Sequence, residues 1–189
     1  MIIGVPKEIK PQEHRIGLTP ASVKILTEKK HEVLVESNGG YEAGFNDEDY
    51  LNSGAKIIKT PDEIFKKADL IVKVKEPQMN EVEMIREGQI IYTYLHLAAA
   101  KELTLGLMKS KSICIAYETV TDDNGRLPLL APMSAVAGRM SIQAGAHALE
   151  KNQKGRGLLI GGAPGVNSAN VVILGGGVVG ENAAIIATG

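Results

Sequence analysis

The stretch Asn170-Val-Val-Ile-Leu-Gly-Gly-Gly-Val-Val-Gly-Glu181 decides how this chain is expected to fold. It opens with a continuous apolar run, 171–174, which predicts a strand buried on both faces. Three glycines follow with the G-x-G-x-x-G spacing: Gly175, Gly177 and Gly180. This spacing permits a tight turn and close approach of backbone to a pyrophosphate, which would sit at the start of a helix predicted over 182–187. The stretch therefore predicts a dinucleotide-binding β-turn-α unit in preference to a purely structural glycine turn.

A complete dinucleotide-binding domain needs more chain than follows this turn. The acidic residue that holds the ribose is expected about 20 residues beyond the glycines, after a second strand. The chain of 189 residues stops at Gly189. We therefore expect a complete domain over residues 1–130, a connecting helix over 131–150, and the start of an incomplete nucleotide-binding domain over 151–189. Residues beyond about 170 should be poorly held unless another chain completes the sheet.

Residues 1–130 alternate between strand patterns and helix patterns. Short apolar runs predict strands over residues 2–5, 32–36, 55–59, 70–75, 89–94 and 112–120. Helices are predicted between them, beginning at Thr19-Pro20, near Tyr50 and at Thr60-Pro61 with a capping box, and then over 81–86 and 98–109. A further helix is predicted from Ser134, as its N-cap, to Glu150. The alternation is typical of an α/β fold with a mostly parallel sheet and helices on both faces, a Rossmann-like domain.

Composition excludes several classes of function. The net charge of -1 and a pI near 6.4 give no field that would attract nucleic acid or an anionic membrane. Cys114 is the only cysteine and lies in an apolar run, so no disulfide framework exists. No segment reaches the length of a membrane span, no signal peptide is recognisable, and no cluster has metal-ligand spacing. We expect a soluble cytoplasmic protein with no nucleic-acid partner, no membrane association and no metal.

Three residues are candidates for a small-molecule site. In open α/β sheets, ligands bind at the carboxyl ends of strands, and Lys75 and His96 each follow a predicted strand closely. A lysine can hold a carbonyl or carboxylate oxygen, and a histidine can exchange a proton near neutral pH. Arg15, in the first long loop, can grip a carboxylate with two parallel bonds. The alternatives are a solvated Lys75 with Lys73 equally placed, a hydrogen-bonded core histidine at 96, and a solvated arginine at 15.

The chain resembles the amino-terminal half of the bacterial alanine dehydrogenases, in the alanine dehydrogenase and nicotinamide nucleotide transhydrogenase family. Eight blocks in order carry this resemblance: residues 4–9, 15–20, 72–77, 94–98, 116–120, 129–134, 137–140 and 175–180. The most specific are Val72-Lys-Val-Lys-Glu-Pro77, Tyr94-Leu-His-Leu-Ala98 and Leu129-Leu-Ala-Pro-Met-Ser134. The resemblance extends over essentially the whole chain.

The resemblance implies reversible oxidative deamination of L-alanine to pyruvate and ammonia, with NAD as cofactor. It implies that Arg15 and Lys75 bind substrate and that Lys75 and His96 are catalytic, with His96 as the acid/base. Further cofactor contacts are implied for Ser134, Val178 and Val179, beside Gly175, Gly177 and Gly180. It also implies a cytoplasmic homo-oligomer, commonly a hexamer, of subunits with two α/β domains around a cleft.

The sequence departs from the family pattern at two positions and leaves other readings open. Ala135 stands where an acidic residue is usual, and Glu181 places a carboxylate near bound phosphates where a neutral residue is usual. Because the parts of the family pattern beyond Gly189 are absent, we expect a truncated chain that is inactive alone. The residue that distinguishes NAD from NADP lies in that absent part. The alternatives are the NAD-binding portion of a proton-translocating transhydrogenase and a non-catalytic module that pairs with intact subunits.

Overall fold

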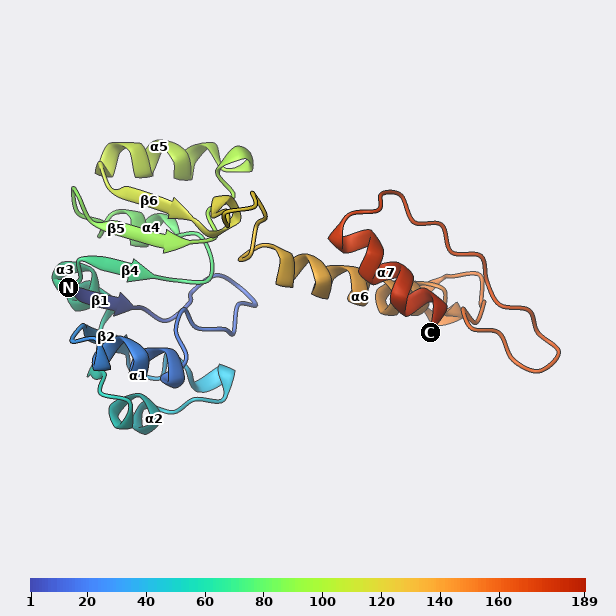
Figure 1. The fold of residues 1–189 in the computed structure, drawn as a ribbon, viewed down its shortest axis with the longest axis horizontal. Coiled ribbons are helices and arrows are strands. Elements are labelled where there is room, and N and C mark those ends of the chain that lie inside the picture. The colour runs from blue at the N-terminus through green and yellow to red at the C-terminus, as the bar shows by residue number, and fades with distance from the viewer. The chain divides into compact units, whose positions relative to one another are not determined.

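A computed structural model describes residues 1–189, which form two compact units, Met1–Val120 and Thr121–Gly189 (Figure 1). The first unit contains one sheet and the helices that cover it. The second unit contains two long helices and the glycine-rich segment between them. No helix combines the length and the hydrophobicity needed to cross a membrane.

The first unit is built on a six-stranded sheet with the order β3-β2-β1-β4-β5-β6. Every neighbouring pair of strands is parallel. The strands are β1 (Ile2–Val5), β2 (Glu32–Glu36), β3 (Lys56–Ile58), β4 (Leu70–Val72), β5 (Ile90–Thr93) and β6 (Ile113–Ala116). This order is that of a doubly wound Rossmann sheet, so the predicted α/β class and parallel pairing are confirmed.

The helices of this unit begin where the sequence offers a cap or a proline. They are α1 (Pro20–Glu28), α2 (Asp47–Asn52), α3 (Pro61–Lys67), α4 (Met79–Val82) and α5 (Lys101–Ser110), with short 3-10 turns η1 (Tyr41–Ala43), η2 (Leu97–Ala99) and η3 (Tyr117–Thr119). Thr19 caps α1 by accepting the N–H of Ser22 at 3.4 Å, as predicted. Thr60 precedes α3 but its side chain makes no capping bond, so the predicted capping box is absent there.

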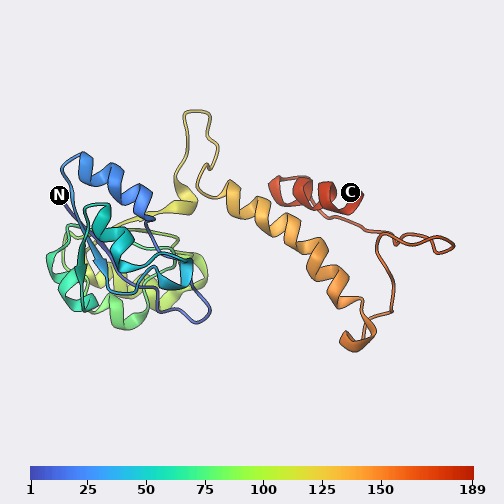
Figure 2. The same cartoon turned by 90° about the horizontal axis from the view of Figure 1, so that it is seen from below.

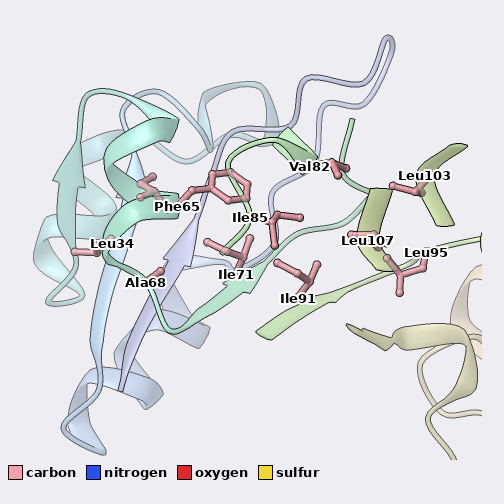
Figure 3. Packing of buried hydrophobic residues seen from close by; sticks show 11 residues of the cluster. Leu34, Phe65, Ala68, Ile71, Val82, Ile85, Ile91, Leu95, Leu103 and Leu107 are labelled. Carbon is pink, nitrogen blue, oxygen red and sulfur yellow. The ribbon is translucent and has the colours of Figure 1, made fainter. Parts of the chain in front are cut away.

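Alternating side chains of the strands enter two separate hydrophobic clusters. One cluster joins Leu34 and Ile71 to residues of α3, α4 and α5, and Figure 3 shows Phe65, Ile71 and Ile91 facing one another within it. The other cluster joins Val35 and Val72 to residues of α1 and α2. Because successive strand residues point to opposite faces, the two clusters lie on the two faces of the sheet. Helices therefore cover both faces, which confirms the prediction.

Two strands end earlier than their apolar runs predict. β4 ends at Val72: the N–H of Lys73 still donates to the carbonyl oxygen of Tyr92 at 3.1 Å, but Val74 donates to Glu8 Oε1 at 2.6 Å and Lys75 donates to the same oxygen at 3.3 Å. β6 stops at Ala116, where the 3-10 turn η3 begins. These early ends free residues 73–75 and 117–119 to form loops at the carboxyl edge of the sheet.

The second unit packs helix α6 (Ala131–Ala148) against α7 (Val178–Thr188), which lies alongside it in Figures 1 and 2. A short 3-10 turn, η4 (Lys151–Gln153), follows α6. The two helices approach closely at Gly138, where any Cβ would collide with the carbonyl oxygen of Val179. Glycine is therefore required there for the helices to touch.

Two predictions for this unit are wrong. Ser134 is not an N-cap, because α6 begins at Ala131 with Pro132 in its first turn, where a missing N–H costs nothing. The run 171–174 forms no strand, and Val172 and Leu174 are 82% and 94% exposed. A strand needs neighbours to accept its backbone hydrogen bonds, and residues 1–189 place none beside this segment. The predicted helix after the glycines is present as α7.

Candidate active site at the carboxyl edge of the sheet

The strand order creates a ligand-binding position between β1 and β4. From β1 the chain builds the sheet in one direction through β2 and β3, and from β4 it builds in the other direction. Loops that leave such a switch point diverge and open a crevice at the carboxyl ends of the strands. Glycine at position 17 allows the loop after β1 to lie over the end of β4, since a Cβ there would be 2.5 Å from the carbonyl oxygen of Val72.

Lys73 and Lys75 have different environments, although strand alternation made them equal candidates. The ammonium of Lys73 lies 3.0 Å from Glu8 Oε2 and 2.8 Å from Glu81 Oε1, and its side chain is 1% exposed. Lys73 is thus a buried structural cation. The side chain of Lys75 makes no hydrogen bond or ion pair, and the residue is half-buried.

The backbone of Lys75 is fixed from both sides. Its N–H donates to Glu8 Oε1, and its carbonyl oxygen accepts a bond of 2.9 Å from Thr93 Oγ1 on β5. Pairing with Arg15 is the main cause that lowers the pKa of Glu13; burial raises the pKa of Glu76 and pairing with Lys10 lowers it; the positive charge of Lys75 adds to the lowering of both. A fixed backbone with an unpaired ammonium is the arrangement expected of a lysine that binds an anionic or carbonyl oxygen.

Arg15 is paired with Glu13 on the loop after β1. Its Nε donates to Glu13 Oε1 at 2.8 Å and its Nη2 donates to Glu13 Oε2 at 2.6 Å. The side chain of Arg15 is nevertheless 50% exposed. The arginine is therefore neither free in solvent nor buried, and its charge interacts with Tyr94 and Glu8.

His96 follows β5 in a strained backbone conformation. Its φ and ψ are 50° and 38°, in the left-handed region that residues other than glycine rarely adopt. The carboxylate of Glu118, just after β6, holds this turn by accepting the N–H of His96 at 2.7 Å and that of Leu95 at 3.1 Å. Strain of this kind is concentrated at functional sites.

The imidazole of His96 is exposed, so the alternative of a core histidine does not hold. The ring stacks on Tyr94, with centroids 6.2 Å apart and planes inclined by 18°. It lines a pocket of about 440 Å³ between residues 95–99 and 116–119. The imidazole thus borders open space large enough for a small metabolite.

Lys75 and His96 lie at the same edge of the sheet. The N–H of Tyr94 donates to the carbonyl oxygen of Val74 at 3.3 Å, so the segments that carry the two residues run side by side. The sequence prediction missed three carboxylates that organise this edge: Glu8, Glu13 and Glu118. Glu8 and Glu118 also follow strand ends, so the rule that selected Lys75 and His96 could have found them.

The glycine turn of the second unit has the conformation that its spacing predicts. Gly175 has φ of 103°, and a Cβ at Gly180 would collide with the carbonyl oxygen of Gly175. Gly177 is the N-cap of α7, and Val178 and Val179 are its first residues. Ser134 is half-buried and lies one helical turn before Gly138. Gly138 is the residue of α6 that lies against the carbonyl oxygen of Val179. The turn can present backbone N–H groups to an anion.

Comparison with known proteins identifies the family. The family model described as the N-terminal domain of alanine dehydrogenase/PNT matches residues 4–137, and the corresponding C-terminal domain model matches residues 141–189. The chain belongs to the alanine dehydrogenase/PNT family. The eight sequence blocks therefore indicated the correct family.

Curated relatives of this alanine dehydrogenase/PNT chain match it from end to end. The alanine dehydrogenase of Halomonas elongata is 53% identical over all 189 residues, and that of Methanococcus maripaludis is 52% identical over the same length. Each match covers 51% of the relative. The chain thus spans about half the length of these relatives.

Solved structures agree with the family assignment. A structure of L-alanine dehydrogenase matches with a TM-score of 0.91 and 52% identity, over all of this chain and 52% of that one. A transhydrogenase from Sinorhizobium meliloti matches with a TM-score of 0.81 and 23% identity, over all of this chain and 56% of that one. The second likeness extends to the fold alone.

Proposed function

We propose that this chain provides the substrate site and the phosphate-binding turn of an L-alanine dehydrogenase. The reaction is the reversible NAD-dependent oxidative deamination of L-alanine to pyruvate and ammonia. The proposal rests chiefly on the grouping of Arg15, Lys75 and His96 at one sheet edge. Identity of about half to alanine dehydrogenases over the whole chain supports it.

The two cations divide the recognition of an α-keto acid between them. Arg15 binds the carboxylate, because a planar guanidinium matches the two oxygens of that group. Lys75 binds the carbonyl oxygen of pyruvate as a compact point charge. Stabilising negative charge on this oxygen makes the carbonyl carbon more open to attack by ammonia.

His96 is the acid/base of the proposed site. In the deamination direction it takes a proton from the water that adds to the imine of alanine. It then helps to move protons as the carbinolamine collapses to pyruvate and ammonia. The Glu118 carboxylate holds the backbone of this histidine, and stacking on Tyr94 restricts its ring.

NAD fits the glycine turn of the second unit. Gly175 and Gly180 allow the tight turn, Gly177 leaves no Cβ in the way of a pyrophosphate, and the α7 amino terminus with Val178 and Val179 supplies N–H donors. When bound, NAD supplies the two-electron acceptor for oxidation of the alanine Cα. Ser134 is assigned a further cofactor contact.

Several broader assignments belong to the same proposal. The domain division is 1–130, 131–150 and 151–189, the protein is cytoplasmic, and it assembles as a homo-oligomer, as a hexamer when full length. A transhydrogenase function is less well supported, because exchange between two nicotinamides gives His96 and Lys75 no imine or keto acid to act on.

The test is an assay of NADH oxidation that depends on both pyruvate and ammonia. It is applied to the 189-residue chain and to any longer product of the same reading frame, with His96→Ala and Lys75→Ala as variants. Activity that needs both substrates and is lost in both variants supports the proposal. Exchange between two nicotinamides without pyruvate would identify a transhydrogenase instead. Absence of pyruvate turnover in the longest product would refute the proposal.

A further inference from the structure

Arg15 donates three hydrogen bonds to one carboxylate, that of Glu13. Two come from its guanidinium, at 2.8 Å and 2.6 Å, and the third from its own backbone N–H to Glu13 Oε1 at 3.0 Å. Side chain and backbone are thus tied to the same group. A long side chain that would otherwise sample many rotamers is held in one.

The two partners differ in their exposure. The side chain of Glu13 is 7% exposed, whereas that of Arg15 is 50% exposed. The Glu13 carboxylate is therefore buried within the loop, and the Arg15 guanidinium contacts it on one side while its other side is exposed to solvent. An exposed ion pair that formed only by chance would leave both partners in solvent.

The pair uses only one edge of the guanidinium. Arginine has five N–H donors in a fixed fork, and Glu13 occupies the edge formed by Nε and Nη2. Both N–H groups of Nη1 and the second N–H of Nη2 remain, and one outward-pointing N–H of each of these nitrogens forms the end of the fork. That end can bind a second carboxylate in the same bidentate way.

The Glu13 carboxylate is ionised at neutral pH. Pairing with Arg15 is the main cause that lowers its pKa to about 2, and the charge of Lys75 adds to this. Arg15, Lys75 and Glu13 then sum to one positive charge. A single positive charge matches an α-keto acid with one carboxylate.

We propose that Glu13 is a positioning residue, which holds the side edge of the Arg15 guanidinium so that its free end binds the carboxylate of pyruvate. This inference rests on the proposed function. The opposite possibility is that Glu13 occupies Arg15 as a competitor that the substrate must displace. The two make opposite predictions for removal of the Glu13 charge.

Loss of the negative charge alone would make the site more positive and tighten the binding of an anion. Loss of positioning would weaken binding, since the substrate would then have to order the arginine, at a cost of about 0.5–1.5 kcal/mol, or roughly two- to tenfold in affinity. We expect the positioning effect to exceed the charge effect. Because the two effects oppose each other, the net change should be smaller than the positioning effect alone: pyruvate should bind about two- to fivefold more weakly to Glu13→Gln, and more weakly again to Glu13→Ala.

The experiment is an NMR titration of the 189-residue chain with pyruvate, for wild type and both variants. Glu42→Gln is the matched control, because Glu42 pairs with His14, the residue before Arg15 in the chain, but its side chain is about half exposed. It should leave pyruvate affinity unchanged. Hydrogen exchange of the Arg15 Nε–H without ligand provides an independent measurement. It should be slow in wild type and as fast as that of exposed Arg156 in Glu13→Gln.

The outcomes separate this inference from the proposed function. Slow Arg15 exchange in wild type together with weaker pyruvate binding in the Glu13 variants supports it. Unchanged or tighter binding in Glu13→Gln overturns it while leaving the proposed substrate intact. Fast Arg15 exchange in wild type also overturns it. If wild type fails to bind pyruvate although exchange is slow, the role of Glu13 in pyruvate binding is overturned, whereas the proposed substrate is decided separately by the turnover assay on the longest product.

Discussion

Replacement of Lys73 by methionine should strongly destabilise the first unit. The ammonium lies between Glu8 Oε2 at 3.0 Å and Glu81 Oε1 at 2.8 Å, and all three side chains are at most 2% exposed. Methionine fills nearly the same volume without a charge. The variant Lys73→Met therefore leaves two carboxylates buried without their cation.

The expected loss is about 3–5 kcal/mol at pH 7, the range for breaking a buried ion pair by removing one partner. Proton uptake limits this loss. Burial already raises the pKa of Glu81, against the opposing effect of Lys73, so the variant should raise it further. When the pKa of a carboxyl group is higher in the folded than in the unfolded protein, the folded state loses stability as pH rises from the unfolded-state pKa to the folded-state pKa. The destabilisation should consequently shrink as pH is lowered from 7 to 5.

Urea unfolding followed by tyrosine fluorescence measures this effect. The chain has no tryptophan, and its five tyrosines, at 41, 50, 92, 94 and 117, all lie in the first unit. The control is Lys67→Met, which removes an exposed ion pair with Glu63 and should cost less than about 0.5 kcal/mol. The double variant Lys73→Met/Glu81→Gln should recover part of the loss. A Lys73→Met variant as stable as the control at pH 7, or equally destabilised at pH 5 and pH 7, would refute the reasoning.

Three further predictions concern the turn and the histidine loop. Gly180→Ala should abolish binding of ADP, because its Cβ collides with the turn, whereas Gly176→Ala, with open space around it, should bind ADP as wild type does in calorimetry. Glu181→Gln should tighten ADP binding severalfold, and more at low salt, because it removes a carboxylate from the first turn of the phosphate-binding helix; an unchanged Kd would contradict this. Glu118→Gln should destabilise the first unit by about 1 kcal/mol at neutral pH. Burial raises the pKa of Glu118, but hydrogen bonds from the N–H groups of His96 and Leu95 outweigh this effect, so the net pKa is lowered. The difference in unfolding free energy between wild type and Glu118→Gln should therefore vanish in urea titrations as pH falls below about 4.5.

The order of strands and helices along the first unit could be predicted from local patterns. Apolar runs of four to nine residues located the six strands of the first unit, and Thr19-Pro20 located the start of α1. The alternation of strands and helices implied parallel pairing, because a parallel strand requires a crossover. Each of these signals is contained in a few consecutive residues.

Strand ends and cation roles could not be predicted in this way. Lys73 and Lys75 point to the same side of an extended chain, and only the contacts of Glu8 and Glu81 make the first a buried cation and leave the second available. Glu8 is separated from Lys73 by 65 positions along the chain. Pairing over such a distance depends on the completed sheet, which no local pattern describes.

The sequence by itself determined the α/β class, the family and the glycine turn, because these depend on short-range periodicity and on motifs that require particular residues. The tertiary structure alone decided that Glu13 holds Arg15, that Glu118 holds His96 in a left-handed turn, and that 171–174 stays unpaired. Hydrogen bonds between distant segments and the presence of neighbouring strands determine these features. An apolar run can predict a strand, but only another strand can satisfy its backbone.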